Sequence, residues 1–68
     1  MEMIFVESSA MEAIGYDSNS AVLRIQFTDS VYEYYDVPQY VYDELLSADS
    51  KGAYANKNIY KQYAQQRL

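Results

Sequence analysis

The sequence contains no cysteine, no histidine and no tryptophan, and it has one proline and two glycines. Without cysteine the chain has no stabilising disulfide and no thiolate ligands for zinc. Without histidine it lacks the commonest general base, the usual metal ligand and the base of Ser-His and Cys-His catalytic pairs. We therefore expect no enzymatic activity, no bound metal and no cofactor. The fold must be held by packing alone, or by packing together with self-association.

The 68 residues are enough for one small domain, which we place over residues 1–68. Half of the chain is hydrophobic and 22% is charged, which is typical of a folded protein. A domain of this size buries about 60% of its unfolded surface, so we expect a thin core. The sequence shows neither a signal peptide nor a run of membrane-spanning length. We therefore predict a cytoplasmic protein with no membrane partner.

Charge is divided unevenly along the chain, which carries 10 acidic and 5 basic residues and a net charge of −5. Residues 1–50 contain all ten acidic residues and only one basic residue, Arg24, so their net charge is −9. Residues 51–68 carry four bases and no acid, for a net charge of +4. This asymmetry indicates a charged partner, although acids in turns and cations near a helix end produce the same pattern.

The first half of the chain predicts antiparallel strands. Leu23, Ile25 and Phe27 alternate with polar neighbours and define one buried face. We expect strands over Met11–Tyr16, Ala21–Thr28 and Val31–Val37, while Met3–Val6 is either a further strand or an ordered arm. Turns fall at residues 17–20 and at Asp29-Ser30, which fits a two-residue hairpin link.

The second half predicts two helices. Pro38 ends the third strand and suits the first turn of a helix. Ser50 is a plausible N-cap for a second helix over residues 51–65, with Ala55, Ile59 and Tyr63 on one stripe. The predicted fold is therefore α+β, a three-stranded antiparallel meander followed by two C-terminal helices packed on one face of the sheet.

Nine tyrosines provide the candidate binding residues. Tyr32 and Tyr34 lie on the same face of the third strand. If that face is open, the two rings form a platform for stacking RNA bases, worth about 1–3 kcal/mol per base. If it lies under the helices, the rings belong to the core. The strand register decides between the two, and the sequence does not fix it.

The predicted second helix carries the other candidates. Tyr54, Lys57 and Lys61 fall on one face, opposite the Ala55, Ile59 and Tyr63 stripe, and are candidates for contacting RNA or an acidic protein; the alternative is a solvated helix face. Ser50 and Lys51 at its start are candidates for an anion contact. No glycine-rich phosphate loop accompanies them.

An ordered set of motifs resembles the KTSC domain family, named for the C-terminus of some lysyl-tRNA synthetases and also found as short bacterial or phage proteins. The set is Val6-x-Ser8-Ser9, Ile14-Gly15-Tyr16-Asp17, Phe27, Tyr32-Glu33-Tyr34, Val37-Pro38, Ala48-x-Ser50-Lys51-Gly52-x-Tyr54-x-Asn56, Ile59 and Tyr63. The resemblance implies an RNA-binding role through the synthetase association. Three positions depart from the family pattern, Ser30, Ala55 and Tyr60, and the last two weaken a nucleic-acid surface on the second helix.

Two functions follow as hypotheses. The first is a non-enzymatic module that binds a protein partner, either a second copy of itself or a basic nucleic-acid-handling protein that it inhibits for a phage or mobile element. The acidic net charge and the abundance of tyrosine favour this one. The alternative is an RNA-binding accessory domain that stacks bases on Tyr32 and Tyr34.

Overall fold

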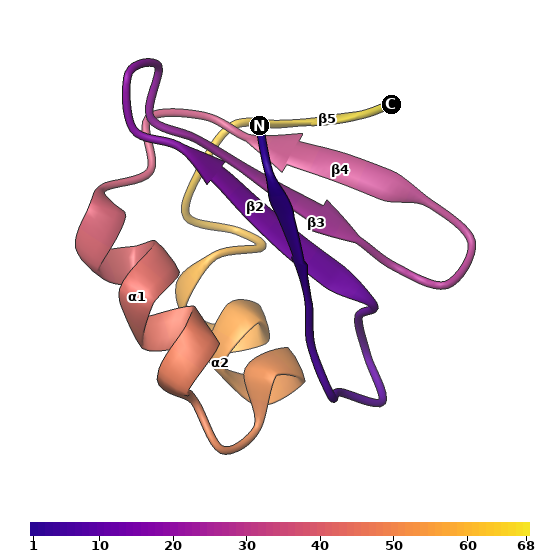
Figure 1. Ribbon diagram of the computed structural model, residues 1–68. Coiled ribbons are helices and arrows are strands. Elements are labelled where there is room, and N and C mark those ends of the chain that lie inside the picture. Colours follow the sequence, from indigo (N-terminus) through magenta and orange to yellow (C-terminus); the bar gives the residue numbers. More distant parts are fainter.

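The computed structural model describes all 68 residues and contains five strands and two helices (Figure 1). Along the chain the elements are β1 (Met3–Phe5), β2 (Ala13–Asp17), β3 (Val22–Gln26), β4 (Val31–Tyr34), α1 (Gln39–Ser47), α2 (Lys51–Asn58) and β5 (Gln65–Arg67). The strands form one antiparallel sheet in the order β1-β2-β3-β4-β5. Both helices lie on one side of it, which confirms the predicted α+β class. Neither helix is long and apolar enough to cross a membrane.

The sheet has five strands where the sequence predicts three. Residues 3–5 form β1, so the N-terminal apolar run is a strand that pairs with β2. The unexpected strand is β5, because the second helix ends at Asn58 rather than at residue 65. A turn follows in which the amides of Ile59 and Tyr60 both donate to the Ala55 carbonyl, at 2.8 and 2.9 Å.

Strand β5 covers the outer edge of β4. The Tyr35 amide donates to the Ala64 carbonyl at 2.9 Å, and the Leu68 amide donates to the Val31 carbonyl at 2.8 Å. The sequence Gln65-Gln66-Arg67 contains none of the β-branched or aromatic residues that are enriched in strands. Pairing with β4 therefore overrides local preference, which explains why the hydrophobic pattern does not reveal this strand.

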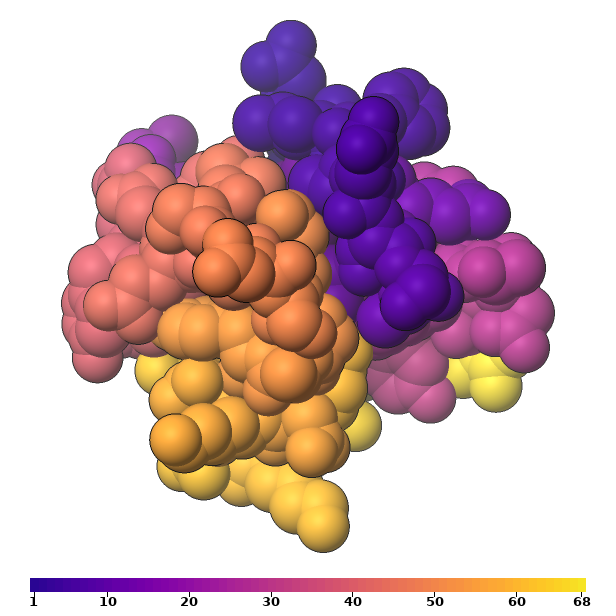
Figure 2. Space-filling model, turned by 90° about the horizontal axis from the view of Figure 1, so that it is seen from below, coloured from indigo at the N-terminus to yellow at the C-terminus, as the bar shows by residue number.

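The predicted helix starts are confirmed. Pro38 is the residue immediately before α1, with an extended backbone. Ser50 caps α2, since its side-chain oxygen accepts a hydrogen bond from the Ala53 amide at 3.3 Å. The cap fixes where α2 begins, directly after the short link from α1, so the two helices lie beside one another (Figure 2).

The register of β3 and β4 decides where the tyrosines of β4 lie. Leu23 pairs with Tyr34 and Ile25 pairs with Tyr32, so both rings share the face on which the helices pack. Tyr34 is only 3% exposed, and Tyr32 is half-buried against the core. The face is therefore covered, and the open stacking platform considered from sequence does not exist.

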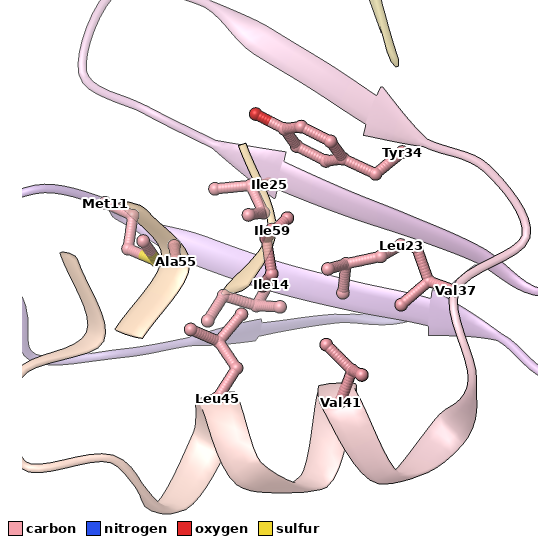
Figure 3. Packing of buried hydrophobic residues seen from close by; sticks show 10 residues of the cluster. All are labelled: Met11, Ile14, Leu23, Ile25, Tyr34, Val37, Val41, Leu45, Ala55 and Ile59. Atoms are coloured by element: carbon pink, nitrogen blue, oxygen red, sulfur yellow. The ribbon is translucent and has the colours of Figure 1, made fainter. Parts of the chain in front are cut away.

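The core lies between this face and the helices (Figure 3). Its members are Met11, Ile14, Leu23, Ile25, Tyr34, Val37, Val41, Leu45, Ala55 and Ile59. Aromatic rings extend it toward the β5 side of the sheet: Tyr32 and Tyr34 stack at 6.4 Å between ring centroids, and Tyr60 packs on Tyr34 and Phe27 at 6.1 Å from each. The expected thin core is thus widened by half-buried aromatics.

The burial of Tyr34 predicts that its ring is essential for stability. Replacing it by alanine leaves a large cavity and should lower the free energy of unfolding by about 3–5 kcal/mol. That is a large part of the roughly 3–10 kcal/mol expected for a domain of this size. Tyr35→Ala is the matched control, because the Tyr35 side chain lies on the other face of the sheet. Urea unfolding followed by circular dichroism should show a much smaller loss for Tyr35→Ala; equal losses would contradict the packing described.

Burial also predicts how stability depends on alkaline pH. Removal from water raises the pKa of Tyr34 to about 12, with neighbouring Tyr60 and Tyr32 adding to the effect. The unfolded chain loses this proton near pH 10, so the stabilisation is complete below pH 10 and is lost as the pH rises toward 12. Unfolding measured from pH 9 to 11 should show a shallower decline in Tyr34→Phe than in the unsubstituted protein. An identical decline would show that Tyr34 is not desolvated.

Candidate functional site

The nine tyrosines divide into groups with different surroundings. Five of them pack in aromatic pairs, namely Tyr34 within the core and Tyr16, Tyr32, Tyr42 and Tyr60 against it. Tyr35 lies on the opposite face of the sheet, where its hydroxyl donates to Glu33. The remaining three stack on no other ring, and all three line one hollow. That hollow is the candidate site.

The hollow, here called the tyrosine groove, lies between α1 and α2 and has a volume of about 350 Å³. Its apolar lining is formed by Tyr40, Val41, Tyr54 and Tyr63, and its polar lining by Glu44, Lys57, Asn58 and Gln62. The two helices that form it adjoin on the side of the molecule seen in Figure 2. The volume is at the lower end of the roughly 300–1,000 Å³ usual for ligand pockets. It suits a side chain or a small ligand.

Helical spacing explains most of the lining. Tyr40 and Glu44 are four residues apart in α1, and Tyr54 and Lys57 are three apart in α2, so each pair shares a helix face. Tyr63 does not lie on a helix. It lines the groove because α2 ends at Asn58 and the chain then turns back.

This early helix end corrects the sequence prediction for the second helix. Tyr54 and Lys57 share a surface as predicted. Lys61 is exposed but lies beyond the helix and does not line the groove. Tyr63, predicted for the opposite stripe, joins Tyr54 in the groove. The continuous helix face assumed for Tyr54, Lys57 and Lys61 is therefore wrong.

A hydrogen bond across the groove connects the two helices. The Tyr54 hydroxyl donates to Glu44 Oε1 at 2.5 Å. Partial burial and this bond to a carboxylate raise the pKa of Tyr54 to about 12, with the negative charge of Glu44 adding to the effect. The Tyr54 hydroxyl therefore stays protonated at neutral pH and donates its hydrogen bond to Glu44. This bond holds the Glu44 carboxylate at the groove wall.

The cations near the groove are not paired with Glu44. Lys57 is exposed and forms no ion pair. The one salt bridge of the protein joins Arg24 to Glu33 on the other face of the sheet, with Arg24 Nη2 and Glu33 Oε2 at 2.5 Å. The groove therefore offers an unneutralised carboxylate, three aromatic rings and several amide or ammonium donors. This chemistry suits the binding of a ligand or of a partner's side chain.

Ser50 and Lys51, the candidates for an anion contact, lie in a second hollow of about 220 Å³ between the β1–β2 connection and the start of α2. Ser50 is occupied as the N-cap, and Lys51 Nζ donates to the Ala48 carbonyl at 3.2 Å. Two carboxylates, Glu7 and Asp49, also line this hollow. The geometry does not favour an anion there. No three acidic side chains gather into a group that could hold a metal ion.

Tyr40, Glu44, Asn58 and Gln62 are not among the candidate site residues identified from the sequence. A signal for the first two is present in the sequence, since a tyrosine and a glutamate four residues apart fall on the polar side of α1. Their position opposite Tyr54 depends on how α1 packs beside α2, which is a tertiary property. No local pattern indicates Gln62.

Comparisons with known proteins agree on one family. The family model of the KTSC domain matches residues 7–63. A protein of Tsukamurella paurometabola is 50% identical over 52 residues, covering 75% of this chain and 78% of the relative. A lysine–tRNA ligase of Nostoc sp. is 38% identical over 63 residues, which are 91% of this chain but 11% of the ligase.

A solved structure gives the same result. The crystal structure of a KTSC domain protein from Yersinia pestis superposes with a TM-score of 0.95 at 31% identity, covering 98% of this chain and 96% of that one. The family match thus extends over most of the chain, and the chain has the same fold as a solved member of the family. The resemblance of the sequence motifs is confirmed: this chain belongs to the KTSC domain family.

Proposed function

We propose that this chain is a small, non-enzymatic binding module whose tyrosine groove contacts a protein partner. The observation that carries the proposal is the convergence of Tyr40, Tyr54 and Tyr63 on one hollow, free of stacking with other rings. Tyrosine is enriched at protein interfaces because it offers a large apolar area together with a polar hydroxyl. Tyr40 is 61% exposed, so its ring is available for contact.

The net charge of −5 supports a basic protein partner, in line with an inhibitor of a nucleic-acid-handling protein.

RNA is the alternative partner, and the lysine–tRNA ligases in which a similar segment occurs support it. Tyr34 is buried in the core and therefore cannot stack on a base. Half-buried Tyr32, paired in register with Arg67 of β5, is the remaining aromatic and basic combination for the RNA alternative.

Site-specific photocrosslinking tests the proposal. A photoreactive phenylalanine analogue at position 40, on the groove, should crosslink a discrete protein in lysate of a bacterium that encodes this chain. The same analogue at position 28, exposed in the β3–β4 hairpin, should not. Excess unlabelled protein should abolish the crosslink, and a Tyr63→Ala competitor should abolish it less effectively.

The RNA alternative makes the opposite prediction in a parallel titration. Fluorescence anisotropy with labelled tRNA at about 50 and 200 mM salt would then show binding that weakens with salt. If Tyr32→Ala removed such binding in a folded protein while position 40 gave no protein crosslink, RNA binding would replace our proposal. Tyr32 and Lys61 do not line the groove, so the two outcomes are separable.

Self-association is a second candidate, favoured by the free edge of the sheet. Strand β1 pairs only with β2, so its other edge is open. Phe5 in this strand is 82% exposed, and Met1 and Ile4 are also exposed. Gly15 allows β1 to lie close to β2, because a Cβ at this position would be 2.9 Å from the Glu2 carbonyl oxygen. An open edge with apolar side chains can pair with the same strand of a second copy.

Sedimentation at rising protein concentration tests this candidate. The unsubstituted protein should form a concentration-dependent dimer, and Phe5→Lys should remain monomeric because it places a charge on the edge. Thr28→Lys is the matched control with the same charge change at an exposed hairpin position. A monomer at all concentrations, or a dimer unaffected by Phe5→Lys, would rule out pairing through β1.

A further inference from the structure

The geometry of the tyrosine groove points to a specific occupant. We infer that the groove receives an arginine side chain of the protein partner, with the guanidinium against Glu44 and the tyrosine rings along its sides. This inference rests on the proposed function, since it names the chemistry of the partner at the same site.

The carboxylate of Glu44 is held in place yet has capacity left. Its Oε1 accepts from the Tyr54 hydroxyl at 2.5 Å, while Oε2 has no hydrogen-bond partner within the chain. A carboxylate has about four acceptor positions, and a guanidinium presents paired donors that match them. A neutral donor could use one of these acceptor positions but would not compensate the negative charge, and an anionic group would be repelled.

The ring lining suits a flat cation. Tyr40, Tyr54 and Tyr63 stack on no other ring, so their faces are not committed to aromatic partners. A guanidinium is planar and weakly hydrated, and it is attracted to the negative face of an aromatic ring. The methylene groups of an arginine side chain can pack along the same rings. Lysine offers the charge without the planar shape.

Lys57 does not cancel the attraction for a cation. Its side chain is exposed and forms no ion pair with Glu44. The side chains of Lys57 and Gln62 add donors at the groove, and neither side chain donates a hydrogen bond within the chain. Peptide carbonyls flanking an arginine can accept hydrogen bonds from these donors. The groove thus matches a short basic peptide segment better than a phosphate, which would face Glu44.

Nuclear magnetic resonance titration of the full chain tests the inference directly. N-acetyl-arginine methylamide should shift the signals of Tyr40, Glu44, Tyr54 and Tyr63, with a dissociation constant of about 1 mM or weaker for so small a ligand. The citrulline analogue, which has the same shape without the charge, should bind on the order of tenfold more weakly. The lysine analogue should also bind more weakly than arginine, and inorganic phosphate should leave the groove signals unchanged.

Two variants isolate the role of Glu44. Glu44→Gln keeps the acceptor for Tyr54 and should weaken arginine binding on the order of tenfold. Asp43→Asn removes the same charge from the neighbouring exposed position, which does not line the groove, and should leave binding nearly unchanged. Equal weakening in both variants would mean that only the general field attracts arginine, and the inference would be overturned.

The outcomes separate this inference from the function on which it rests. A groove-specific protein crosslink with no arginine-dependent shifts would overturn the arginine site and leave the binding module intact. Phosphate-dependent shifts at Lys57 without arginine-dependent ones would reverse the expected charge of the ligand and overturn the inference as well. Arginine-dependent shifts that require Glu44 support it.

Discussion

The pairing of β3 with β4 is the constraint on which the rest of the structure depends. Because Leu23 lies opposite Tyr34 and Ile25 opposite Tyr32, the apolar side of β3 and the tyrosines of β4 occupy the same face. A shift of one residue would turn both rings to the open face and would leave the helices without an aromatic layer to cover. The register therefore packs Tyr32 and Tyr34 against or within the core, and the tyrosines that are free for contact are those of the groove.

Much of the fold could be predicted from local patterns. The alternation of Leu23 and Ile25, the break at Pro38 and the Ser50 cap give the strands and helix starts correctly, because each depends on neighbouring residues. Strand β5 could not be predicted, because Gln65, Gln66 and Arg67 become a strand only by pairing with β4.

The candidate site was harder to predict because its residues are brought together by packing. Helical spacing alone predicts that Tyr54 and Lys57 share a surface. Glu44 joins them through the contact between α1 and α2, and Tyr63 joins them through the turn after Asn58. The nine tyrosines could be recognised as unusual, but dividing them into core and groove required the strand register and the helix end. Tertiary structure thus decides which members of an informative set carry function.

We propose that the tyrosine groove, rather than the sheet, contacts a protein partner. Hydrogen exchange of the chain alone and in complex with the protein captured by the groove crosslink tests it most directly. Binding at the groove should slow exchange at the groove-lining parts of α1 and α2, around Glu44 and Tyr54, and should leave the β3–β4 hairpin unchanged. Protection confined to β4 and β5, around Tyr32 and Arg67, would contradict it.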